Sequence, residues 1–177
     1  MRFFPVLIAI ALTVITRTLP HPPNFTALNS LPVFLGRHSR KVYGYLISVL
    51  LTLASLILSD LIIGDIEKNF WLRYLLFCSM VFIPSLLSNL KSWLNYVLSP
   101  LAGSIYYFIV SNFFVWLTSG MYEKTLEGIL LCYLYAIPFG INSLLSTYFY
   151  FAIMETVLFT EKKVSKALHS KKLITGK

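Results

Sequence analysis

A series of long apolar runs limits this chain more than any other feature of its sequence. Five runs are long enough, or nearly so, to cross a hydrocarbon layer about 30 Å thick. Of the 177 residues, 57% are hydrophobic and 12% are charged, whereas a soluble domain carries roughly 25% charged residues. The sequence therefore predicts an all-α, polytopic transmembrane helix bundle. The five runs cover residues 3–19, 42–64, 70–90, 95–118 and 127–158.

A sixth apolar run, 27–36, has only ten residues. As a helix it would span about 15 Å, half of the layer. Three prolines within residues 20–23 precede it, and proline ends a helix at or before its own position. The first helix should therefore stop near Leu19. Non-helical backbone close to a membrane is tolerated where protein buries it or where it lines a wet cavity, so residues 20–26 are a candidate solute-binding loop.

The first run has two features of a signal peptide, because Arg2 precedes an apolar stretch. No small-x-small cleavage site follows, and we expect a retained helix. The sequence thus predicts six helices, the second one short, in a transmembrane domain over residues 1–160. A basic cytoplasmic tail over residues 161–177 follows.

The positive charges predict the orientation of the chain. Six of the fifteen Lys and Arg residues lie after residue 161. The net charge of +8 therefore indicates a solvated cytoplasmic tail or, alternatively, contact with anionic lipid head groups, and not nucleic acid. With six spans, eleven cations lie inside and four outside. The count is the same if 27–36 does not cross and the N-terminus moves outside. Both arrangements give a multi-pass protein of the cell inner membrane with a cytoplasmic C-terminus. The inner cations of the six-span arrangement are Arg2, Arg37, Arg40, Lys41, Lys91 and the six tail lysines; the outer ones are Arg17, Lys68, Arg73 and Lys124.

Some polar residues within the apolar runs are candidates for solute contact. Asp60 lies near the end of the second long run, where a carboxylate faces a cavity or a partner, or else reaches water at the interface. Asn112 and Trp116 share a helix face because they are four residues apart. They either grip a planar polar ligand or serve as a helix–helix hydrogen bond and an interface anchor. Pro138 in the last run marks either a transport-type broken helix or a packing kink.

Metal, cofactor and catalytic motifs are not apparent in the sequence. Cys78 and Cys132 lie inside apolar runs without metal-ligand spacing, and His21 and His38 are expected to be solvated loop residues. Glu155 should meet water or the basic tail. No GxSxG, HExxH or Walker motif occurs, so we expect neither an enzyme nor a chain that hydrolyses ATP by itself.

Three segments carry a family resemblance: RTLPHPPNFTALNSLPVFLG, then SDLIIG, then SNFFVWLTSGMYEKTLEGILLCYLYAIPFGIN. In this order they resemble a family of uncharacterised bacterial membrane proteins described as transport proteins, over about residues 5–159. That family is similar to the substrate-binding S components of energy-coupling-factor transporters.

The resemblance implies an S-component-like bundle that binds a small solute near its outer face, under the loop after the first helix. A coupling subunit and an ATPase pair would be separate chains, and no cofactor is implied. S components present alanines four apart on helix one to meet the coupling subunit, where this chain has Ala9 and Thr13. The substrate-binding positions implied by the matching motifs are Asn24, Phe25, Thr26, Ser59, Asp60, Asn112, Trp116, Tyr122, Thr125 and Cys132.

Two functions remain open at this point. The first is a small-solute transporter or the substrate-binding subunit of one. The alternative is a non-transport membrane scaffold or assembly protein, whose intramembrane polar residues only bond helix to helix.

Overall fold

The computed structural model describes the backbone of residues 3–64 and 70–175, and side chains as far as Ser170. Arg2, Lys68 and Lys177, which entered the charge count, lie outside the described residues. The described chain is helical with short connections and contains no strand, as the sequence predicts. Its elements are α1 (Phe3–Thr18), α2 (Ser30–Arg37), α3 (Lys41–Ile63), α4 (Phe70–Met80), α5 (Ile83–Leu86), α6 (Ser92–Thr118) and α7 (Leu126–Thr175).

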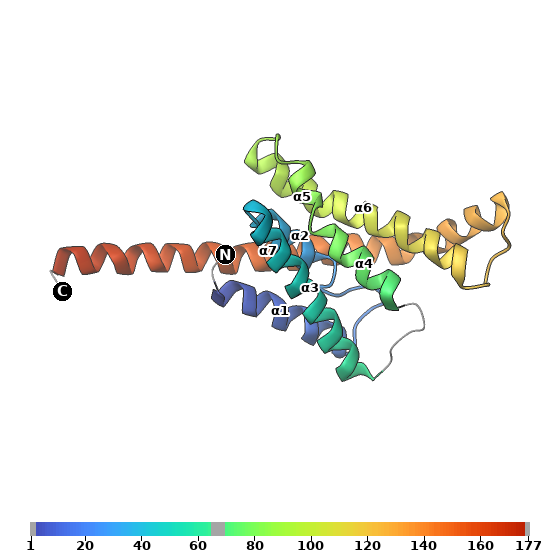
Figure 1. Ribbon diagram of the computed structural model, residues 1–177, viewed down its shortest axis with the longest axis horizontal. Coiled ribbons are helices and arrows are strands. Elements are labelled where there is room, and N and C mark those ends of the chain that lie inside the picture. The colour runs from blue at the N-terminus through green and yellow to red at the C-terminus, as the bar shows by residue number, and fades with distance from the viewer. Residues whose placement is uncertain (1–2, 65–69, 176–177) are drawn as a thin grey trace.

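These elements correspond to the six predicted runs, because α4 and α5 together cover the single run 70–90. Successive runs travel in opposite directions along the long axis of the molecule (Figure 1). Two ends can therefore be defined. At the Asp60 end, α1, α3 and α6 finish and α4 begins; at the Glu155 end, α2 finishes and α3 and α6 begin.

Three helices are long and apolar enough to cross a membrane: α3, α6 and the part of α7 up to Ser170. Their side chains are arranged opposite to those of a soluble bundle. On α3, Leu46, Leu50 and Leu61 are exposed, whereas Ser59 and Asp60 are almost fully buried. Helices that expose their apolar faces and bury their polar ones suit an apolar surrounding, where packing and interhelical hydrogen bonds hold helices together.

The short helix α2 occupies the centre of the bundle. All of its residues from Ser30 to Gly36 are buried, and α2 contacts the six other helices. It has eight residues, which make about 12 Å of helix. This helix alone is therefore too short to cross the hydrocarbon layer, as the length of the run predicts. The chain nevertheless returns from the Asp60 end to the Glu155 end between α1 and α3, because residues 19–29 supply the rest of the distance. We call residues 19–29 the proline loop.

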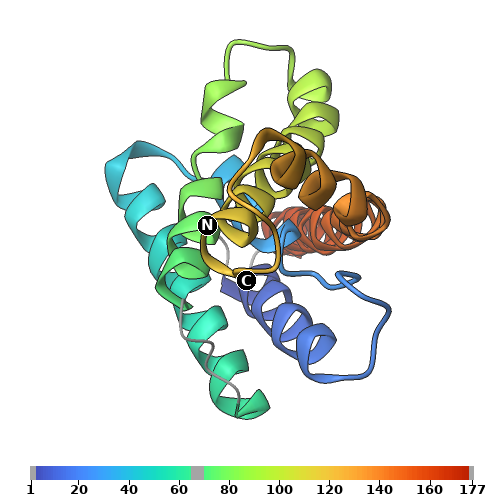
Figure 2. The same ribbon diagram turned by 90° about the vertical axis from the view of Figure 1, so that its right-hand side faces the viewer.

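The last helix is much longer than its apolar run. It continues from Leu126 to Thr175, 50 residues, or about 75 Å, whereas the apolar run ends at 158. Pro138 lies inside it without ending it. The basic segment is therefore a straight continuation of α7 beyond the bundle and not a separate element (Figure 1). Seen from the right-hand side of Figure 1, α7 (orange to red) lies at the edge of the bundle (Figure 2).

Gly36 permits the closest backbone approach in this packing. A Cβ atom at this position would lie 1.9 Å from the carbonyl oxygen of Val81, in the break between α4 and α5. We expect Gly36→Ala to lower the apparent melting temperature of the detergent-purified protein, because overpacking against backbone costs about 1–3 kcal/mol. Gly44→Ala is the matched control, since its nearest neighbour would be Ser39 Cα at 3.4 Å. Equal melting temperatures for the two variants would contradict this packing.

Candidate functional site

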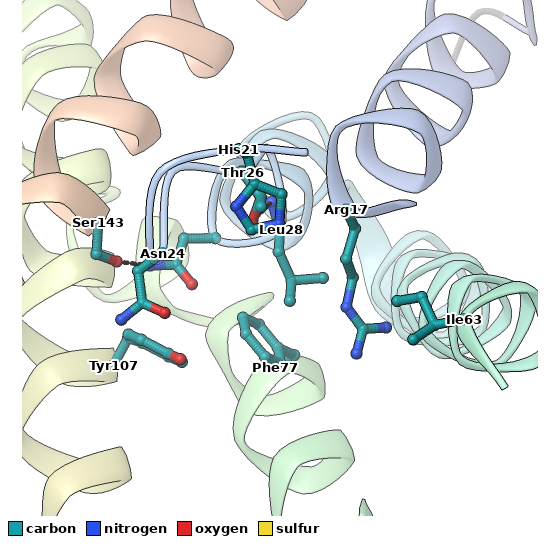
Figure 3. Close-up of a pocket in the computed structure, with 10 residues that line it drawn as sticks. Arg17, His21, Asn24, Thr26, Leu28, Ile63, Phe77, Tyr107 and Ser143 are labelled. Atoms are coloured by element: carbon teal, nitrogen blue, oxygen red, sulfur yellow. Dashed lines mark hydrogen bonds between the residues drawn. The ribbon is translucent and has the colours of Figure 1, made fainter. Parts of the chain in front are cut away.

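A cavity of about 230 Å³ lies between the proline loop and the ends of the surrounding helices (Figure 3). Its wall carries more polar than apolar side chains, although it lies inside a bundle with an apolar exterior. Polar groups come from α1, from the loop and from α7, and apolar ones mainly from α3 and α4. The lining residues are Arg17, His21, Asn24, Thr26, Leu28, Asn29, Ile63, Phe77, Tyr107 and Ser143.

Helix α7 holds the proline loop in place. Ser143 Oγ accepts a hydrogen bond of 2.6 Å from Asn29 Nδ2, and Asn142 Nδ2 donates to the carbonyl of Pro23 at 3.1 Å. Ser146 Oγ donates to the carbonyl of Asn24 at 3.3 Å. The stretch Asn142–Ser146 thus supplies the partners that the non-helical backbone lacks.

The start of α2 and the end of α1 complete this support. Ser30 Oγ donates to the carbonyl of Thr147 at 3.0 Å, and the amide of Ala27 donates to Thr16 Oγ1 at 3.0 Å. Thr147 lies one turn after Ser143 on α7, so the same stretch of α7 fixes both the loop and the start of α2.

Asn24 has an unusual backbone conformation in the loop. Its φ is +59°, in the left-handed region that asparagine tolerates better than most residues and glycine adopts freely. This turn aims the Asn24 side chain into the cavity (Figure 3). The same residue lines a second, smaller cavity of about 160 Å³ that also includes Tyr107 and Asn112. The two cavities therefore adjoin at Asn24 and Tyr107.

Asp60 lies at the centre of an ion-pair cluster. Its Oδ1 lies 2.5 Å from Arg17 Nη1, and its Oδ2 lies 2.6 Å from both Arg73 Nη2 and the Tyr74 hydroxyl. The Asp60 side chain is 1% exposed. The alternative in which Asp60 reaches water at the interface is therefore wrong. Asp60 does not line the cavity itself, but it holds Arg17, which does. The Arg17 guanidinium also contacts Ser59 Oγ.

The remaining predicted site residues lie outside the main cavity. Phe25 packs edge-on against Tyr150, with ring centroids 6.0 Å apart. Asn112 donates to the carbonyl of Phe108 in its own helix at 2.7 Å, so the expected interhelical bond from this side chain is not made. Cys132 Sγ contacts the carbonyl of Asn112 at 3.4 Å.

Trp116 bonds to the turn that follows its helix. Its Nε1 donates to the carbonyl of Glu123 at 2.9 Å, and the Lys124 ammonium lies 5.1 Å from its ring centroid. Tyr122 and Thr125 lie in the same turn between α6 and α7. Of the ten predicted positions, Asn24 and Thr26 line the main cavity, and Asn112 lines the second cavity. Ser59 and Asp60 do not line either cavity, but they contact Arg17, which lines the main one.

A second charged cluster at the Glu155 end was not foreseen. Glu155 Oε1 lies 2.7 Å from His38 Nε2 and 3.3 Å from Arg37 Nε. Arg37 also donates to the side chain of Asn95. His38 is therefore not the solvated loop residue that we expected, and Glu155 meets the end of α2 and not only water or the tail. Arg17, Asn29 and Ser143 were missed as well. The signal for Arg17 was the buried carboxylate at Asp60, which requires a cationic partner.

A comparison with protein families identifies the family of this chain. It belongs to a family of unknown function (DUF6580), whose match covers residues 1–168. No protein of curated function matches the chain, and no solved structure does.

The Asp60 cluster gives a test of what holds the site together. We expect Tyr74→Phe to destabilise the protein by about 1.5–3 kcal/mol, because the lost hydrogen bond is made to a charged group. Tyr133→Phe is the matched control, since the Tyr133 hydroxyl donates to the carbonyl of Ile109 at the same 2.6 Å but to a neutral acceptor. Interhelical bonds of that kind contribute about 0.6 kcal/mol on average. Unfolding both variants in one detergent measures the difference, and equal losses would show that Asp60 is not a charged acceptor.

Proposed function

We propose that this member of the DUF6580 family is a multi-pass, non-enzymatic protein of the cell inner membrane that binds a small polar solute for transport. The observation that carries the proposal is the polar cavity beneath the proline loop. Buried polar surface in a membrane bundle is expensive and is retained where it lines a solute or ion path.

The distribution of cations supports an orientation with the Glu155 end in the cytoplasm. The connection from α2 to α3, the start of α6 and the extension of α7 all lie at that end. They carry Arg37, Arg40, Lys41, Lys91 and the described tail lysines, as the positive-inside rule requires. The proline loop then faces the outside. Its residues 20–24 are exposed, so a solute would enter past them.

The cavity suits a small solute with several hydrogen-bonding groups. Its volume of about 230 Å³ corresponds to roughly eight water molecules in the liquid and lies below the 300–1,000 Å³ that is usual for drug-sized ligands. Arg17, Asn24 and Asn29 offer donors from different parts of the wall. Phe77 and Leu28 offer an apolar surface for the body of the solute.

The resemblance to S components supports a role as a substrate-binding subunit that a coupling subunit and ATPases would drive. The solute would be captured from the outside and then released after a rocking movement of the bundle. One surface argues against the usual docking mode. Ala9 and Thr13, which correspond to the face that meets the coupling subunit, are both 0% exposed and pack inside this bundle. A coupling subunit would have to dock on another face.

A scaffold or assembly role is the second candidate, and one observation favours it. Several of the polar groups expected to bind a solute are satisfied within the chain: Asp60 by two arginines and a tyrosine, Asn112 and Trp116 by backbone carbonyls. Such bonds could serve only to fix the helices. Neighbouring genes for an ATPase pair and a coupling subunit would favour transport, whereas a biosynthetic cluster would favour the scaffold.

Asn24 provides the sharpest test of solute binding. A thermal-shift screen of the purified protein against vitamins, metals and nucleobase-like compounds should find a stabilising compound, because a ligand of the folded state raises its stability. Asn24→Gly should abolish that shift without lowering the melting temperature of the free protein, since glycine keeps the positive φ and removes only the amide.

Asn24→Ala is the companion variant. It should also lose the shift, but it should melt lower without ligand, because a left-handed alanine costs about 1–2 kcal/mol. A compound that stabilised Asn24→Gly as strongly as the original chain would place its site elsewhere and contradict the cavity assignment.

Asn112→Ala tests whether the second cavity belongs to the same site. The substitution removes an amide that bonds only its own helix, so the fold should tolerate it. If solute extends past Asn24, the apparent affinity should fall several-fold, as expected for the loss of one hydrogen bond worth about 1 kcal/mol. Titration of the screened compound measures the change. An unchanged affinity and unchanged uptake would restrict the site to the main cavity.

A further inference from the structure

The Glu155 end contains a cleft that the solute site does not use. Its volume is about 470 Å³, and it lies where the end of α2, the start of α3 and the middle of α7 meet. The cleft is lined by Arg37, His38, Ser39, Arg40, Gly44, Ile47, Leu158 and Lys162. Three of these eight residues are permanent cations, and no carboxylate lines it.

The cations of the cleft fall into two groups. Arg37 and His38 are held by Glu155, and Arg37 also lies over the ring of Tyr96 at 5.4 Å. These side chains form a fixed wall. Arg40 and Lys162 are exposed, and their side chains form no ion pair or hydrogen bond with any described residue. The charges of this second group are therefore available to an outside anion.

An apolar strip continues from the cleft along the outside of α3. Ile47 belongs to both, and Leu46, Ile47 and Leu50 are 53%, 52% and 54% exposed. Leu158 closes the floor of the cleft and is 4% exposed. The cations that line the cleft thus lie next to the apolar strip, which continues along α3.

We propose that this cleft binds the phosphate of an anionic phospholipid between Arg40 and Lys162, with an acyl chain along the exposed face of α3. Basic pockets between membrane helices on the cytoplasmic side recognise lipid head groups in this way. The apolar strip selects a lipid over a free phosphate, because a free phosphate would leave the strip unused. The site lies at the opposite end from the solute cavity, and it does not depend on whether a solute binds there.

The experiment uses the full chain in detergent micelles that contain increasing fractions of phosphatidylglycerol or phosphatidylcholine. Phosphatidylglycerol should raise the melting temperature at a lower mole fraction than phosphatidylcholine. Arg40→Gln and Lys162→Gln should each weaken the apparent affinity for phosphatidylglycerol about fivefold, and the double variant about 25-fold, since each cation near a lipid surface contributes about 1 kcal/mol. Melting without lipid should not change, because both side chains are exposed.

Lys163→Gln is the matched control. Lys163 adjoins Lys162 on α7 but does not line the cleft, and its ammonium lies over the ring of Phe159 instead. It should keep the affinity of the original chain. Equal responses of Lys162→Gln and Lys163→Gln, or equal stabilisation by the two lipids, would overturn the proposal. Full stabilisation by soluble glycerol phosphate, or by a poly-glutamate peptide, would also overturn it by identifying a soluble anion or an acidic protein segment as the ligand.

Discussion

The structure depends on one constraint: the backbone of the proline loop must find hydrogen-bond partners inside a bundle whose exterior is apolar. Three prolines within 20–23 prevent a helix, which would have satisfied its own backbone. Helix α7 provides two of these partners, because Asn142 and Ser146 donate to the carbonyls of Pro23 and Asn24. Ser143 and the carbonyl of Thr147 accept from the side chains of Asn29 and Ser30, which fixes the end of the loop and the start of α2. This requirement explains why α7 carries a polar face in the middle of its apolar run. It also explains why α2 starts so deep in the bundle, since Ser30 is fixed to Thr147.

The sequence predicted the helices well because the lipid-facing pattern is simple. Runs of apolar residues set the ends of α1 and α3 to within one residue, and the prolines set the end of α1 at Thr18. The length of α7 was not predictable in this way, because Lys and Glu are good helix formers that end an apolar run without ending a helix. The break at Val81 was also missed. Pro84 explains it, because proline removes the hydrogen bond to the carbonyl of Met80, and Gly36 packs closely against the carbonyl of Val81 in this break.

The candidate site was less predictable than the helices. Asn24 and Thr26 were implied by the family resemblance of the PHPPNFT segment, and both line the cavity. Asn29, Ser143 and Tyr107 were not, since a polar residue among apolar ones gives no sign of what it faces. Asp60 also shows how far a contact can be predicted from the sequence. Its depth indicated a partner, but only the fold shows that Arg17, 43 positions earlier, supplies it.

The two charged clusters have a common consequence for movement of the loop. Arg17 just before the proline loop is bound to Asp60 on α3, and Arg37 and His38 at the end of α2 are bound to Glu155 on α7. Both ends of the segment from 17 to 38 are therefore fixed by buried or half-buried ion pairs, which are costly to break by removing one partner. Between them, α2 is buried on all sides. Under the proposed function, a movement that admits a solute would involve the exposed residues 20–24, where the bonds of Asn142 and Ser146 to backbone carbonyls would open. Both bonds join neutral groups, so opening them should cost less than breaking the ion pairs at the two ends of the segment.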